Sequence, residues 1–227
     1  MNNIPWIKED FSSNSNHLVI ALGSFYEGLD KKYDPKQFEW DRRLTEISTI
    51  QNFNKLYVKD AGITFWHGKF EGLGHGVHLV ADFLKKEATK AKAEKVLVIG
   101  PSMGGYGALM FTCLCHFDIA IAISPQTMLT SFRYKKNRLN KKFEGLNVNK
   151  EETYIKVIIE RYGSPKSKYF VYYGNKNVPD TEHAKRLENV PNVFLKPLDS
   201  NHHTVAKLMR NTGMTEDIIL RFVRDKL

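Results

Sequence analysis

Cysteine is scarce in this sequence, and long apolar runs are absent. The 227 residues include two cysteines, Cys113 and Cys115, which lie two positions apart. With no second pair they cannot complete a four-ligand zinc site, so we expect no metal and two reduced thiols in a reducing compartment. No apolar run approaches the roughly 20 residues that a membrane-spanning helix needs, so we expect no membrane span.

Internal repeats, low-complexity segments and an excess of acidic residues are also missing. Residues 1–10 show no basic region followed by an apolar stretch and a cleavage site, so we expect a cytoplasmic protein. The 34 lysines and arginines exceed the 25 aspartates and glutamates, for a net charge of +9. This balance favours an acidic partner such as an anionic glycan, nucleic acid or a membrane surface. The zinc-ligand spacings and aromatic motifs of nucleic-acid modules are lacking, which argues against nucleic acid.

Short apolar segments alternate with amphipathic segments along the chain, as in a parallel sheet covered by helices. Most of the apolar segments lack polar alternation, which is typical of strands buried on both faces. Strands are expected at 17–22, 55–58, 95–99, 118–124, 168–173 and 192–195, and helices at 77–88, after residue 102, near 204–210 and near 216–224. The length suits one domain of good size or two small ones.

A short glycine-containing motif carries the main chemical signal. Gly100, Ser102 and Gly104 form the pattern G-x-S-x-G, directly after an apolar strand and before a helix start rich in small residues. This context is typical of a strained strand-to-helix turn that exposes a nucleophilic serine. A side chain at either glycine would collide with the neighbouring strand or helix, and the N–H of Met103 would point to where an oxyanion forms. The alternative is a glycine-rich turn that binds phosphate or nothing.

A nucleophilic serine needs a histidine base and a carboxylate that orients the histidine. After this kind of turn the expected chain order is serine, acid, histidine. Asp180 follows the penultimate expected strand and is the preferred acid, with helix capping as its alternative role; Glu182 and Asp199 are reserve candidates. His202 and His203 follow the last strand, and neighbouring side chains in a loop usually point apart. We favour His203 as the base and keep His202 as the alternative.

Two further segments are candidate parts of the site. The loop after the strand at 17–22 begins at Gly23, so the backbone N–H of Ser24 or Phe25 is the expected second oxyanion donor. The alternative is a glycine-containing loop with no part in the reaction. Residues 126–150 interrupt the α/β rhythm and form a candidate cap or insertion, whose alternative role is a solvated basic helix. The expected substrate-binding cations in it are Arg133, Lys135, Lys136 and Arg138.

The segment 100–105, together with Asp180 and His203, resembles the α/β-hydrolase superfamily, and the likeness covers nearly the whole chain. It implies a single domain over 1–227, with a mostly parallel central sheet flanked by helices. It also implies an acyl-serine mechanism on an ester or thioester. Ser102 would attack the carbonyl, His203 would relay the proton, Asp180 would orient His203, and Met103 with Ser24 would hold the oxyanion.

A finer resemblance involves the segment 60–67 and the basic insertion. These look like bacterial proteins of cell-surface glycan biosynthesis, some of which resemble capsule O-acetyltransferases. That resemblance implies no permanently bound cofactor, with acetyl-CoA as co-substrate and an anionic polysaccharide as acceptor if the protein is a transferase. Three functions therefore remain open: a serine esterase on small acyl esters, including acylated sugars; an O-acyltransferase; and a catalytically inactive module that binds a polyanion.

Overall fold

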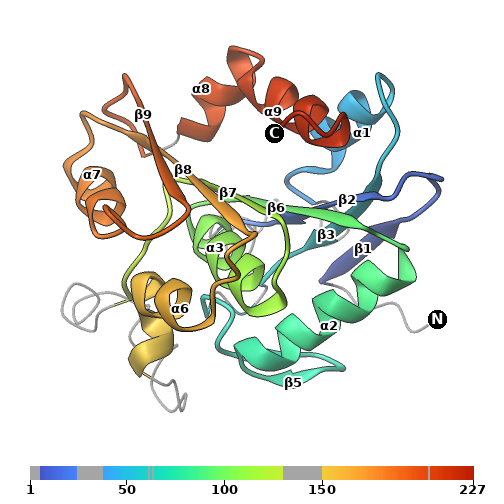
Figure 1. Ribbon diagram of the computed structural model, residues 1–227, viewed down its shortest axis with the longest axis horizontal. Coiled ribbons are helices and arrows are strands. Elements are labelled where there is room, and N and C mark those ends of the chain that lie inside the picture. Colours follow the sequence, from blue (N-terminus) through green and yellow to red (C-terminus); the bar gives the residue numbers. More distant parts are fainter. Residues whose placement is uncertain (1–5, 25–37, 61, 63, 130–149, 204) are drawn as a thin grey trace.

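The computed structural model describes residues 6–24, 38–60, 62, 64–129, 150–203 and 205–227. In this part of the chain a seven-stranded sheet has the order β1-β3-β2-β6-β7-β8-β9 (Figure 1). The strands are β1 (Ile7–Asp10), β2 (His17–Leu22), β3 (Asn54–Val58), β6 (Lys95–Pro101), β7 (Ile119–Ile123), β8 (Lys168–Gly174) and β9 (Val193–Leu198). Only β1 runs antiparallel to its neighbour in this sheet, so the expected mostly parallel sheet is confirmed.

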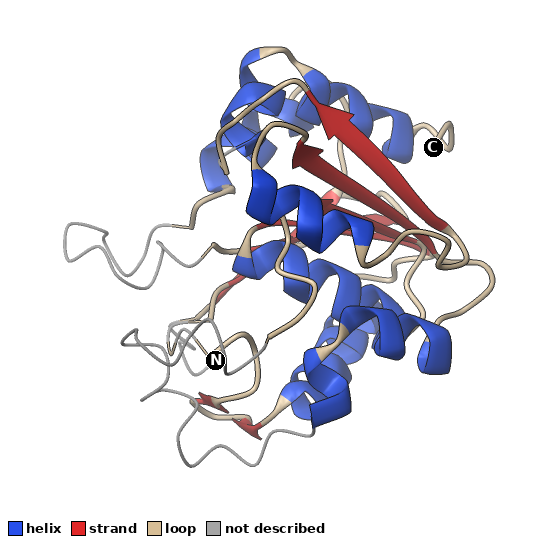
Figure 2. Ribbon diagram, turned by 90° about the vertical axis from the view of Figure 1, so that its left-hand side faces the viewer, coloured by secondary structure: helices blue, strands red, loops and turns tan. Residues whose placement is uncertain are grey.

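Helices cover both faces of the sheet (Figure 2). They are α1 (Asp41–Ser48), α2 (Val77–Lys90), α3 (Met103–Cys115), α6 (Ile155–Tyr162), α7 (Val178–Lys185), α8 (Val205–Asn211) and α9 (Met214–Val223). A 3-10 turn, η2 (Lys150–Thr153), precedes α6, and β4 (Lys69–Phe70) pairs with β5 (Gly74–His75) apart from the main sheet. No helix in the described residues combines the length and apolar character that crossing a membrane requires.

Alternate side chains of each central strand pack into two separate hydrophobic cores, one on each face of the sheet. In β2, Leu18, Ile20 and Leu22 pack with residues of α2, α3 and α6, whereas Val19 and Ala21 pack with residues of α1, α8 and α9. Since successive strand residues point to opposite faces, a strand covered on both sides must be apolar throughout. This explains why the central strands could be located in the sequence as unbroken apolar runs.

Helix α3 lies at the centre of the molecule and begins at the candidate nucleophile. Every residue from Met103 to Cys113 is buried. A helix that is apolar on all sides must be covered on all sides, and α3 packs against β6, β7, α2 and α6. The first turn of α3 is therefore held rigidly at the carboxyl edge of the sheet.

The edge strand β1 and the short helices α1 and α6 are elements that the sequence pattern did not indicate. Strand β1 reads Ile-Lys-Glu-Asp and pairs antiparallel with β3. Two of its charged side chains form ion pairs, since Lys8 pairs with Asp41 and Asp10 Oδ2 lies 2.9 Å from Lys55 Nζ. Charged side chains on an edge strand discourage pairing with another chain, but they also remove the apolar pattern by which a strand is found.

Candidate active site

Ser102 is the single residue between strand β6 and helix α3, and its backbone is strained. Its φ of +52° lies in the left-handed region, which non-glycine residues rarely adopt. The N–H of Ser102 donates to the carbonyl oxygen of Ile123 at 2.7 Å, which ties the turn to β7. Backbone strain of this kind persists only where the surrounding structure holds it, and it is concentrated at functional sites.

The two glycines of the motif are required by close packing around this turn. A Cβ on Gly100 would lie 2.5 Å from the carbonyl atoms of Gly104. A Cβ on Gly104 would lie 2.5 Å from the carbonyl oxygen of Leu22, at the end of β2. Both neighbours are backbone atoms and cannot rotate away, so the expected collisions with helix and strand are confirmed.

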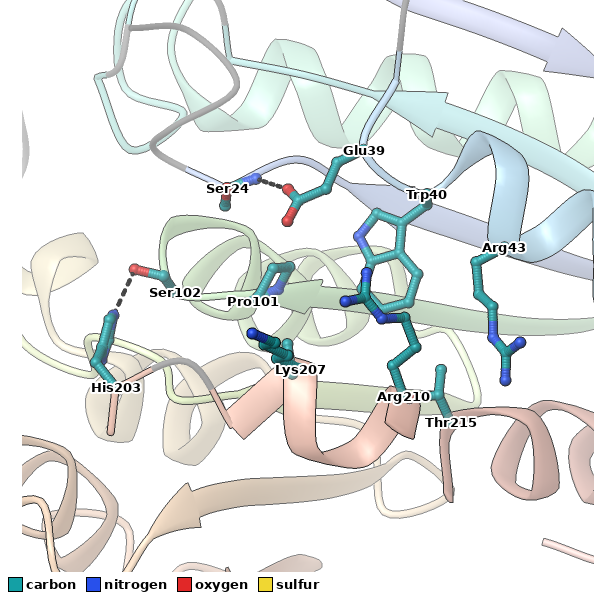
Figure 3. Close-up of a pocket in the computed structure, with 11 residues that line it drawn as sticks. Ser24, Glu39, Trp40, Arg43, Pro101, Ser102, His203, Lys207, Arg210 and Thr215 are labelled. Atoms are coloured by element: carbon teal, nitrogen blue, oxygen red, sulfur yellow. Dashed lines mark hydrogen bonds between the residues drawn. The ribbon is translucent and has the colours of Figure 1, made fainter. Parts of the chain in front are cut away.

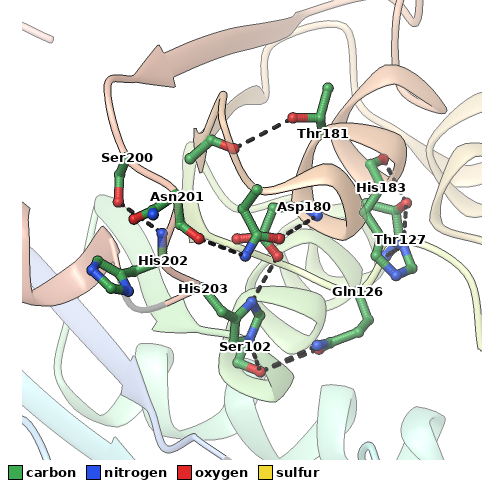
Figure 4. A network of polar contacts seen from close by, with 12 residues as sticks. Ser102, Gln126, Thr127, Asp180, Thr181, His183, Ser200, Asn201, His202 and His203 are labelled. Atoms are coloured by element: carbon green, nitrogen blue, oxygen red, sulfur yellow. Dashed lines mark hydrogen bonds and ion pairs between the residues drawn. The ribbon is translucent and has the colours of Figure 1, made fainter.

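The structure brings Ser102, His203 and Asp180 into one chain of contacts (Figure 4). Ser102 Oγ lies 3.0 Å from His203 Nε2, and His203 Nδ1 lies 2.7 Å from Asp180 Oδ1. Asp180 is 3% exposed, and among the described residues His203 is the one that forms a hydrogen bond with its carboxylate. The three residues come from the β6–α3 turn, from α7 after β8, and from the loop after β9, so all lie at the carboxyl edge of the sheet.

The alternative base, His202, and one alternative acid, Asp199, lie elsewhere. Figure 4 shows the ring of His202 directed away from Ser102. His202 is exposed, and its backbone N–H donates to Ser200 Oγ at 3.1 Å. Asp199 is exposed and pairs with Lys176. Of the two adjacent histidines, the structure therefore brings His203 to Ser102 and leaves His202 outside the contact chain, as it does Asp199.

Helix capping near the acid is done by a different residue from the one considered in the sequence. Asn177 is the N-cap of α7, and its Oδ1 accepts the N–H of Asp180 at 3.1 Å. Asp180 lies in the first turn of the helix, where its side chain is free to turn toward His203. The cap therefore orients the backbone that presents the carboxylate.

Gln126, the first residue of the candidate insertion 126–150, contacts the nucleophile, a role that the sequence analysis did not assign to it. Its side-chain amide lies 3.3 Å from Ser102 Oγ. Because the serine has one proton, which it would donate to His203 as base, the consistent orientation has Gln126 Nε2 donating to Oγ. The signal that could have identified Gln126 is its position shortly after β7, the strand next to β6 in the sheet.

The two expected oxyanion donors have different surroundings. Met103 is the first residue of α3, so its N–H has no acceptor within the helix and is available beside Ser102. The N–H of Ser24 donates instead to Glu39 Oε2 at 2.8 Å, and burial raises the pKa of Glu39. Phe25 lies outside the described residues. The role of Ser24 as second oxyanion donor stays a prediction. It requires the N–H of Ser24 to leave Glu39 and donate to the oxyanion instead.

Asp60, Thr64 and Trp66 form hydrogen bonds that lead to the first residue of α3. The buried carboxylate of Asp60 accepts the N–H groups of Thr64 and Trp66 at 2.7 and 2.9 Å, and burial raises its pKa. Trp66 Nε1 in turn donates to the carbonyl oxygen of Met103 at 3.1 Å. These three residues therefore help to position the first turn of α3.

A pocket of about 310 Å³ opens beside Ser102 and His203 (Figure 3). Of the described residues that line it, three are cationic: Arg43 of α1, and Lys207 and Arg210 of α8. The sequence interpretation had placed the substrate-binding cations at Arg133, Lys135, Lys136 and Arg138, which lie outside the described residues. The spacing of three between Lys207 and Arg210, on an expected helix, was the signal that could have identified this basic face.

No protein-family model matches the sequence, and no curated protein matches it. Solved structures do resemble it. A capsule O-acetyltransferase of Neisseria meningitidis serogroup A has a TM-score of 0.69 at 14% identity, over 92% of this chain and 89% of that one. A carboxylesterase of Nitrososphaera gargenis has a TM-score of 0.61 at 14% identity, over 98% and 96%.

A third similar structure is the Glycosylation Associate Protein (Gap123) complex of Streptococcus agalactiae, with a TM-score of 0.67 at 14% identity. The match covers 95% of this chain but spans only 44% of the length of the other. At these identities the likeness establishes architecture alone. That architecture, a mostly parallel sheet with helices on both faces, is the α/β-hydrolase fold.

Proposed function

We propose that this protein catalyses acyl transfer through an acyl-serine intermediate, with Ser102 as nucleophile, His203 as general base and Asp180 as the residue that orients His203. The observation that carries the proposal is the unbroken contact chain from Ser102 Oγ through both ring nitrogens of His203 to Asp180. A lone serine is a poor nucleophile, and this arrangement supplies both the base and the charge that stabilises the base once it is protonated.

The reaction has two halves. Ser102 Oγ loses its proton to His203 Nε2 and bonds to the carbonyl carbon of an ester or thioester, while the N–H of Met103 donates to the developing oxyanion. The bond to the leaving group then breaks, and His203 returns the proton to that group. In the second half, water or a hydroxyl group gives its proton to His203 and attacks the acyl carbon. The bond between that carbon and Ser102 Oγ then breaks, His203 returns the proton to Oγ, and the acid or the new ester is released.

The proposed substrate class is a carbohydrate, either deacylated by an esterase or acylated by an O-acetyltransferase with acetyl-CoA as co-substrate. Support comes from the structural likeness to a capsule O-acetyltransferase and to a glycosylation-associated complex, and from the net charge of +9, which favours an anionic glycan. Hydrolysis and transfer need the same three residues. The acceptor that reaches the acyl-enzyme decides between them.

The test follows the fate of the acyl group in wild type and in Ser102→Ala. The proteins are incubated with an acetylated sugar, and separately with acetyl-CoA plus neutral or anionic oligosaccharides, and acetate and acetylated glycan are quantified by mass spectrometry. We expect wild type to form one of these products and Ser102→Ala to lose it by about 10⁴-fold or more. Equal product from both proteins would overturn the proposal, as would no product with any substrate.

A further inference from the structure

Helix α8 presents two cations to the pocket because its opposite face is anchored in the core. Val205 and Met209 are fully buried against the sheet, which fixes the rotation of the helix. The face that lines the pocket then carries Ala206, Lys207 and Arg210. Residues three and four apart share one side of a helix, so this presentation follows from the sequence of α8 once its apolar side is buried.

The charges of Lys207 and Arg210 are not balanced by the described residues. Arg43, the third cation of the pocket, donates to Glu216 at 3.1 Å and to Glu46 at 3.4 Å, so its charge is already paired. No described residue forms an ion pair or a side-chain hydrogen bond with Lys207 or Arg210, whereas the one acid that lines the pocket, Glu39, accepts the N–H of Ser24. Among the described residues, these two cations of the pocket therefore have no acidic partner and can pair with an anionic ligand.

Their position relative to the nucleophile indicates which part of a ligand they meet. Figure 3 shows Ser102 and His203 at one end of the pocket, Lys207 beside Pro101 nearer the middle, and Arg210 beyond it. A ligand whose carbonyl lies at Ser102 would therefore place a more distant group between the two cations. Arginine and lysine side chains both bind phosphate, and two positive charges that no described residue balances match a doubly charged phosphate or a diphosphate.

We propose that Lys207 and Arg210 bind a phosphate group of the substrate, remote from the carbonyl that Ser102 attacks. This inference rests on the proposed function, because it uses Ser102 as the point where the acyl group is transferred. The phosphate belongs either to the acyl donor, as in a coenzyme A thioester, or to a phosphodiester-linked glycan. The two sources share the same chemistry at α8.

A direct binding measurement tests the site without relying on turnover. Isothermal titration calorimetry with inorganic pyrophosphate is applied to wild type, to the double variant K207Q/R210Q and to the control K85Q/K86Q. Lys85 and Lys86 are exposed on α2, across the sheet from α8, and the control removes the same charge. We expect K207Q/R210Q to raise the Kd at least about tenfold and the control to match wild type. Equal changes in both variants, or no binding by wild type, would refute the site.

Steady-state kinetics identifies which substrate carries the phosphate. The same proteins are assayed with a neutral acetyl ester, with acetyl-CoA, and with a phosphodiester-linked glycan as acceptor. We expect K207Q/R210Q to raise KM for one phosphate-bearing substrate at least about tenfold more than for the neutral ester. A higher KM for acetyl-CoA would show that the acyl donor carries the bound phosphate, and a higher KM for the glycan would show that the acceptor carries it. An equal rise in KM for all substrates would contradict the proposal. Failure of the proposed function has a different signature, because turnover would then not depend on Ser102 while pyrophosphate still binds.

Discussion

Replacing His203 by alanine is expected to lower kcat/KM for a small acyl ester by about 10⁴-fold, whereas the same change at His202 should alter it by less than about twofold. The two residues are adjacent in sequence, but only the ring of His203 contacts Ser102 and Asp180. His202 is exposed and its ring is directed away. Ester hydrolysis by the two variants, measured side by side, checks this expectation.

The histidine pair is informative because each variant controls for the other. Both changes remove the same side chain from the same loop, so a general disturbance of the loop would affect both proteins. Circular dichroism and thermal unfolding of the two variants show whether each retains the fold. Inactivity of His202→Ala with activity retained by His203→Ala would reverse the assignment of the base.

Asp180→Asn is expected to lower kcat by about 10³- to 10⁴-fold, with Asp199→Asn close to wild type. The asparagine keeps the size of the side chain but removes the charge that stabilises protonated His203, and it can present its amide to Nδ1 and so favour the wrong tautomer. Asp199 lies just before the same histidines in sequence but pairs with Lys176 at the surface. The measurement is the pre-steady-state and steady-state rate of ester hydrolysis.

An equal loss in Asp180→Asn and Asp199→Asn would contradict the assignment of the acid. Glu182→Gln, at the other reserve position, extends the comparison to the same helix as Asp180. A large loss in Glu182→Gln alone would transfer the role to that residue.

The nucleophile turn was predictable because backbone packing leaves its sequence little freedom. Gly100 and Gly104 lie against backbone atoms, so no side chain fits at either position. The central strands were predictable for a related reason, since burial on both faces requires unbroken apolar runs such as that of β2. Where local sequence and tertiary packing impose the same requirement, the pattern can be interpreted with no structure at hand.

Other parts of the site depend on contacts between segments that are distant in sequence. Gln126 contacts Ser102 only because β7 lies beside β6, and the bond between Ser24 and Glu39 joins two separate segments. The basic face of α8 was hidden for another reason. Lys207 and Arg210 are few among the 34 cations of the chain, and only the burial of the opposite side of the helix directs them toward the pocket.

The most direct test of an activated serine is covalent labelling. Wild type and Ser102→Ala are treated with a fluorophosphonate, and their intact masses are measured by mass spectrometry. The contact chain from Ser102 to Asp180 predicts one adduct on wild type and none on Ser102→Ala, with digestion locating the label at Ser102. A folded wild type that gains no adduct, or a Ser102→Ala protein that labels equally well, would contradict the acyl-serine mechanism and favour the polyanion-binding alternative.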